Sequence, residues 1–133
     1  MKTHANASFD VKSWDEKPYH EVAGMPKLTR ASVAKVFHGD FEGEGTVEYL
    51  MMYRSDTSAT FVGMERMVGK LGTRSGSFVL QHGGTDDGKT TKATWFVVPG
   101  SGTGDLRGLR GEGIFVATHG QPNYSFTLDY DFE

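Results

Sequence analysis

The sequence contains no cysteine, which excludes disulfide bridges, thiolate metal sites and cysteine nucleophiles. It also lacks a basic cluster: the formal charge of -3 is spread over single side chains, so the electrostatic signature of nucleic-acid or anionic-lipid binding is missing. No apolar run has the length of a membrane-spanning helix or the form of a signal peptide. We therefore expect a cytoplasmic protein that binds neither nucleic acid nor membranes.

Helical periodicity is missing as well, and most of the chain instead alternates apolar and polar residues at period two, as β-strands do. The alternation is cleanest at the C-terminus, where one face carries Tyr124, Phe126, Leu128, Tyr130 and Phe132. The chain has 133 residues, the usual length of one domain. We expect a single β-barrel domain over residues 1–133.

Glycine-containing turns divide the chain into eight predicted strands, at residues 3–13, 28–41, 46–54, 59–71, 76–82, 90–98, 111–118 and 124–132. Residues 14–27 are predicted to be a loop because Pro18, Gly24 and Pro26 interrupt regular structure. Residues 105–110 allow one short helical turn. Eight antiparallel strands favour a closed up-and-down barrel, because closure removes the exposed edges of an open sheet; a β-sandwich is the alternative.

Counting outward from the predicted hairpin turns places Glu48 opposite Glu65, Glu65 opposite His82, and His82 opposite Ala93. The predicted barrel interior is the face that carries Glu48, Leu50, Met52, Phe61, Gly63, Glu65, Met67, Phe78, Leu80, His82, Ala93, Trp95 and Val97. The opposite face is also rich in apolar residues, including Val47, Tyr49, Met51, Val62, Met64 and Phe96. We therefore expect a homodimer or higher oligomer, or a cover formed by residues 14–27.

Glu65 and His82 are the candidate catalytic residues, since a carboxylate beside an imidazole in an apolar cavity can act as a general acid and base. The candidate ligand-binding residues are Glu48, Met52, Phe61, Met67, Phe78, Leu80 and Trp95. The alternative interpretation is a buried hydrogen-bond network that fixes strand register. No metal-ligand motif such as H-E-x-x-H is present, and residues 99–111 match no phosphate-binding fingerprint. We expect no metal and no cofactor.

Several segments resemble a known family: Val11-Lys-Ser-Trp-Asp-Glu16, Lys27-Leu-Thr-Arg-Ala31, Gly43-Glu-Gly-Thr-Val-Glu-Tyr-Leu50, Phe61-Val-Gly-Met-Glu-Arg66, Arg74-Ser-Gly-Ser-Phe-Val-Leu-Gln-His82, Val98-Pro-Gly-Ser-Gly-Thr-Gly104 and Leu128-Asp-Tyr-Asp-Phe-Glu133. Over nearly its whole length the chain resembles the bacterial domain-of-unknown-function family 3224. The resemblance implies an eight-stranded barrel of the allene oxide cyclase type and brings no established activity.

Allene oxide cyclases and the similar dirigent proteins bind apolar oxylipin or phenolic intermediates inside the barrel. The turn Gly102-Thr-Gly104-x-Leu106 is similar to the Gly-Thr-Gly-x-Phe segment of those barrels, whereas the catalytic residues of the cyclases have no matching motif here. The expected function is binding of a small apolar or aromatic molecule. The alternatives are a cyclase or isomerase that uses Glu65 and His82 for proton transfer, and a structural oligomer with a filled barrel.

Overall fold

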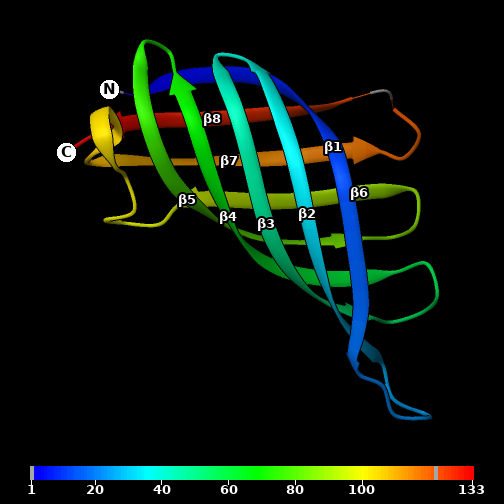
Figure 1. Ribbon diagram of the computed structural model, residues 1–133. Helices are drawn as coiled ribbons and strands as arrows, with labels where there is room; N and C mark the ends of the chain where they lie inside the picture. The colour runs from blue at the N-terminus through cyan, green and yellow to red at the C-terminus, as the bar shows by residue number, and fades with distance from the viewer. Residues whose placement is uncertain (1, 122) are drawn as a thin grey trace.

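The computed structural model describes residues 2–121 and 123–133, in which eight antiparallel strands close into a barrel in chain order (Figure 1). The strands are β1 (Thr3–His20), β2 (Lys27–Gly39), β3 (Phe41–Tyr53), β4 (Ala59–Leu71), β5 (Arg74–Asp86), β6 (Thr90–Val97), β7 (Leu109–Thr118) and β8 (Tyr124–Phe132). The short 3₁₀ helix η1 (Gly104–Leu106) lies between β6 and β7. The predicted fold class is confirmed. Among the described residues, no helix is long and apolar enough to cross a membrane.

The first strand is much longer than predicted. Residues 14–20, expected to be a loop, continue β1 and pair with β2 as far as His20 opposite Leu28. The pairing of β1 with β8 ends at Phe9, so among the described residues the second half of β1 has a ladder partner on one side only. An edge position tolerates proline, which cannot donate to a ladder, and Pro18 therefore does not end the strand. The β1–β2 hairpin projects from the barrel at one corner (Figure 1).

The turn between β2 and β3 was also placed incorrectly. The sequence predicts it around residues 42–45, but the chain reverses at Gly39 and Asp40, and Gly39 has φ +125°. Gly43 and Gly45 lie within β3 instead. Gly43 faces Gly69 across the β3–β4 ladder, and a Cβ at Gly43 would lie 2.2 Å from the carbonyl oxygen of Val68. These glycines permit close contact between strands rather than a turn.

The register of β3 against β4 differs from the prediction by one residue. Tyr53 pairs with Ala59 and Glu48 pairs with Met64, because the connecting loop has five residues rather than four. A one-residue slip exchanges the two faces of a strand. Val47, Tyr49 and Met51 therefore point into the barrel, and the predicted interior residues of β3, which are Glu48, Leu50 and Met52, lie on its outer face.

The two following hairpins differ from the prediction by two residues, and such a shift leaves every side chain on its predicted face. Glu65 pairs with Leu80 rather than with His82, and His82 pairs with Trp95 rather than with Ala93. The interior residues predicted on β4, β5 and β6 are therefore correct. Strand β5 is longer than predicted at both ends, and at its C-terminal end Gly83 and Gly84 continue the ladder instead of ending it.

One end of the barrel is filled by side chains. Large apolar residues with almost no exposed surface pack there, among them Phe37, Phe41, Met67, Phe78, Leu80, Phe126 and Leu128. The glycine-rich connection from β6 to β7 crosses this end, where Thr103 hydrogen-bonds to Ser77 through both backbone and side chain. Leu106 of η1 is fully buried in the same core. This end of the barrel is therefore packed and closed.

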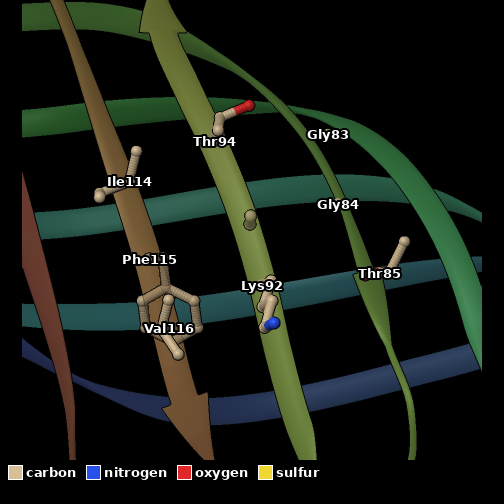
Figure 2. A pocket seen from close by; sticks show the side chains of 9 residues that line it. Gly83, Gly84, Thr85, Lys92, Thr94, Ile114, Phe115 and Val116 are labelled. Carbon is tan, nitrogen blue, oxygen red and sulfur yellow. The ribbon is translucent and has the colours of Figure 1, made fainter.

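The outer face of β3 to β7 carries an unusual number of exposed apolar side chains, which are Leu50, Val62, Met64, Val68, Phe96, Ile114 and Val116. Beside them, Gly83 and Gly84 leave a shallow depression of about 320 Å³ bordered by Thr94 and Ile114 (Figure 2). A Cβ at Gly83 would meet no atom within 4 Å. A two-fold contact uses the same patch on both subunits, and an apolar patch can pack against a copy of itself. The oligomer expected from the sequence stays a prediction.

Light scattering is expected to give a mass of about twice the 14.6 kDa of the chain or a higher multiple. Replacing Ile114, which is 69% exposed, with lysine should return the mass of one chain, because a charge would be buried in the contact. Thr3→Lys, at an exposed position outside this face, is the control and should leave the mass unchanged. A wild-type protein of 14.6 kDa at micromolar concentration would refute the expectation.

Candidate functional site

Four polar side chains meet at mid-height inside the barrel: Lys35 from β2, Tyr49 from β3, Glu65 from β4 and His82 from β5. All four positions alternate with outward-facing neighbours, so each strand directs its side chain inward. Lys35, Glu65 and His82 are 6%, 1% and 4% exposed. Charged groups are almost never buried to this degree unless they are paired.

Two of the three hydrogen bonds of the cluster converge on one oxygen atom. His82 Nε2 lies 2.7 Å and Lys35 Nζ 3.3 Å from Glu65 Oε1. Lys35 Nζ also donates to the hydroxyl oxygen of Tyr49 at 3.1 Å. The other carboxylate oxygen, Glu65 Oε2, is buried and has no hydrogen-bond partner among the described residues. The cluster is thus a chain from His82 through Glu65 and Lys35 to Tyr49.

The charge states follow from burial and pairing. Burial alone would raise the pKa of Glu65, but the Lys35 ammonium and the hydrogen bond from His82 outweigh it and hold the pKa below its ordinary value. Burial opposes the charge on Lys35 too, and attraction to Glu65 keeps its pKa raised. Burial lowers the pKa of His82. The site therefore holds an ion pair and a neutral imidazole whose Nε2–H donates to the carboxylate.

Gly45 on β3 provides the space that Glu65 occupies. A Cβ at this position would lie 2.2 Å from Glu65 Oε2 and 2.8 Å from the ring of Phe37. Because Gly45 does not have a positive φ, its role is to leave room rather than to adopt a special backbone conformation. The glycine in the barrel wall and the carboxylate inside it therefore fit together as a pair.

Trp95 supports the cluster from β6. Its ring meets the imidazole of His82 edge-on at 5.4 Å and stacks on Phe126 at 5.2 Å. Its indole Nε1–H donates to the backbone carbonyl of Thr127 on β8 at 2.9 Å. Trp95 therefore fixes the position of His82 and also joins β6 to β8 across the barrel interior.

A cavity of about 510 Å³ occupies the barrel on the other side of the cluster. Most of its lining is apolar or aromatic, including Phe9, Trp14, Met51, Phe61, Phe115 and Tyr124. Lys35 and Tyr49 are part of the lining, whereas Glu65 and His82 are not. A molecule in the cavity would meet the ammonium and the phenol, with the carboxylate and the imidazole behind them.

A second polar group lies at the rim of the cavity, where β5, β6 and the loop after β7 meet. His119 Nε2 lies 3.0 Å from Asp86 Oδ2 and 3.3 Å from Thr91 Oγ1. The other oxygen of Asp86 accepts the backbone N–H of Gly88 at 2.8 Å. These rim groups are hydrogen-bonded to one another and to the backbone of the turn between β5 and β6.

The predicted site residues divide into three groups. The structure brings Glu65 and His82 together in the cluster, packs Trp95 against His82 and places Phe61 in the cavity wall. Three others, Met67, Phe78 and Leu80, belong to the packed half of the interior. Glu48 and Met52 lie outside, and Glu48 binds Arg30 and Ser32 on the barrel surface. Their inward placement was wrong because of the one-residue slip between β3 and β4.

Sequence reasoning missed Lys35 and Tyr49, the two cluster residues that reach the cavity. Tyr49 was assigned to the outer face by the same slip in β3. Lys35 follows the alternation of Ala31 and Val33 on β2, and that pattern was the available signal. Among residues 2–121 and 123–133, no group of three or more His, Asp or Glu side chains is placed to hold a metal ion.

Replacing Gly45 with alanine is expected to lower the free energy of unfolding by about 1–3 kcal/mol, since the added methyl group would overlap Glu65 and Phe37. Gly83→Ala on β5 is the matched control. A Cβ at Gly83 meets nothing within 4 Å, and the change should stay within about 0.5 kcal/mol. Urea unfolding measures both variants, and equal losses would show that the Gly45 contact contributes nothing.

The buried neutral His82 should make the protein less stable as the pH falls below 6.5, the ordinary pKa of histidine. The unfolded chain takes up this proton and the folded chain does not, so stability drops by at most about 1.4 kcal/mol per pH unit. His82→Gln should flatten the slope of stability between pH 6.5 and 4.5, the ordinary pKa of Glu65.

His4→Gln is the control for this titration. His4 is exposed, and its hydrogen bond to Asp129 raises its pKa. Replacing His4 should therefore not flatten the loss of protein stability as the pH falls below 6.5. Unfolding by urea at several pH values gives the slopes. A His82→Gln protein with the wild-type slope would show that another group causes the acid sensitivity.

The family model described as a protein of unknown function, DUF3224, matches residues 5–130. Among solved structures, the chain is similar to a DUF3224 protein with unknown function from Shewanella oneidensis MR-1, a crystal structure at 1.84 Å resolution. The two share 34% sequence identity with a TM-score of 0.85, over 100% of this chain and 98% of the other. No curated protein matched. The resemblance noted in the sequence is confirmed, and the chain belongs to the DUF3224 family.

Proposed function

We propose that this protein binds a small apolar or aromatic molecule inside its barrel. The observation that carries the proposal is the cavity of about 510 Å³, which lies within the range of about 300–1,000 Å³ typical of small-molecule sites. Its aromatic walls favour flat molecules through stacking and edge contacts. The polar groups at its inner end, Lys35 and Tyr49, would orient the bound molecule.

The uneven filling of the interior supports binding over a purely structural barrel. In a purely structural barrel, side chains would fill the whole interior. They do so in the half that contains Phe41 and Phe78. The other half keeps its aromatic side chains around an open volume. An unfilled apolar cavity lowers the stability of the folded protein. A barrel with only a structural role would therefore be expected to have both halves packed.

An enzyme that uses Glu65 and His82 for proton transfer is the second candidate. The 2.7 Å hydrogen bond between these side chains, next to a cavity, favours it. Neither residue lines the cavity, however, and a general acid or base must come within hydrogen-bond reach of its substrate. Proton exchange with a ligand would therefore have to pass through Lys35 or Tyr49, and we place binding first.

Methyl 2-naphthoate, a flat neutral probe, should bind saturably to the wild-type protein with a dissociation constant below about 1 mM. Quenching of tryptophan fluorescence reports binding, since Trp14 lines the cavity. Ala117→Phe should abolish binding without unfolding the protein, because Ala117 is buried in the cavity wall and the ring would enter the open volume.

Ala34→Phe, at a partly exposed position on β2 where the alternation points outward, is the control and should bind like the wild type. Circular dichroism verifies that both variants keep the fold. If Ala117→Phe binds the ester as tightly as the wild type does, the cavity is not the binding site.

A further inference from the structure

We propose that the ligand carries an anionic oxygen group, such as a carboxylate, phenolate or enolate, which is held by Lys35 and Tyr49 at the inner end of the cavity. This inference rests on the proposed binding function and assigns the chemical class of the ligand. Two observations support it. The cluster presents hydrogen-bond donors to the cavity, and Glu65, the charged acceptor of the cluster, does not line the cavity.

The Lys35 ammonium has three N–H donors. Two are directed to the Tyr49 hydroxyl at 3.1 Å and to Glu65 Oε1 at 3.3 Å, and no hydrogen bond to another described residue uses the third. Lys35 Nζ also lies 4.8 Å from the ring centroid of Phe9 and 5.6 Å from that of Tyr49. The two aromatic faces hold the ammonium in place and offer it no hydrogen-bond acceptor.

Tyr49 adds a second donor beside the first. Its oxygen accepts a hydrogen bond from Lys35, and no residue of the described chain accepts a hydrogen bond from its O–H. Trp14 stacks on its ring with the centroids 6.1 Å apart, and Phe61 meets it edge-on at 5.3 Å. These contacts fix the phenol next to the cavity. The inner end of the cavity therefore presents two neighbouring donors, one of them charged.

Glu65 lies behind Lys35 and does not line the cavity. A ligand would meet the positive end of the ion pair and remain separated from the negative end by the ammonium itself. The polar side chains at the rim, Asp86 and His119, are hydrogen-bonded to each other. A hydrogen bond from a buried cation to an anionic oxygen is about twice as strong as one between neutral groups, and this difference selects an anionic ligand.

The experiment compares two probes of nearly the same shape, 2-naphthoate and its neutral methyl ester, near neutral pH. The wild type should bind the carboxylate at least about tenfold more tightly, a ratio that corresponds to about 1.4 kcal/mol. Equal affinities, or tighter binding of the ester, would overturn the anion assignment and leave the proposed binding function intact. Failure of both probes to bind would overturn the binding function itself.

Removing Lys35 alone would leave Glu65 buried and unpaired and would endanger the fold. The test variant is therefore the double substitution Lys35→Met with Glu65→Gln, which removes both charges and keeps an acceptor for the His82 Nε2–H. It should bind the ester as the wild type does and lose the preference for 2-naphthoate. A preference that persists in this variant would show that the cation does not recognise the anion.

Tyr49→Phe tests the second donor, since it keeps the ring contacts and removes the hydroxyl. It should weaken 2-naphthoate binding several-fold, because the anion loses one hydrogen bond, and leave the affinity for the ester within about twofold. An equal loss for both probes would mean that the substitution had disturbed the cavity wall, and no loss for either would exclude Tyr49 from recognition.

Discussion

The burial of the Glu65 carboxylate is the constraint on which the interior of this barrel depends. An isolated charge in an apolar core costs several kcal/mol even after the surroundings relax, so the fold must supply compensating groups from other strands. Lys35 supplies the opposite charge and His82 supplies a donor. Four consecutive strands, β2 to β5, are tied together at one level, because Lys35 and His82 meet on one carboxylate oxygen and Lys35 also donates to Tyr49.

This polar level also separates two regions with different packing. On one side the interior is filled by large side chains such as Phe41 and Met67 and is closed by Leu106. On the other side the rings of Trp14 and Tyr49, which line the cavity, stack on each other, and the Tyr49 hydroxyl is hydrogen-bonded. Aromatic side chains that are held in this way cannot collapse into the open volume, and the cavity persists although apolar residues surround it.

The alternation of residues predicted the eight strands and the inner faces of β4, β5 and β6. The face that a residue occupies depends only on whether its position along the strand is odd or even, which we call its parity. It failed on β3 because the loop between β3 and β4 has five residues, and a loop of four would place the opposite face of β3 inside. Turn residues such as Ser55 and Ser58 are compatible with both loop lengths. The extension of β1 was missed because Pro18 excludes a central strand but not an edge.

Parity also explains why the most informative residue of the site was overlooked. A lysine in a strand usually points to solvent, and only the neighbouring Ala31 and Val33 indicate that Lys35 does not. Its partner Glu65 was identified without it, although a buried carboxylate requires a compensating charge. Without Lys35, the pairing of Glu65 with His82 indicated a general acid and base.

The addition of Lys35 changes the chemistry of the pair with Glu65 and His82. Lys35 stabilises the ionised carboxylate, and burial keeps the imidazole neutral, so neither group is poised to exchange a proton near neutral pH. A cluster whose protonation is held in one state suits the orientation of a ligand better than the transfer of protons. The cavity adjoins the cationic side of that cluster, and electrostatics therefore favours molecules that bring a negative charge to it.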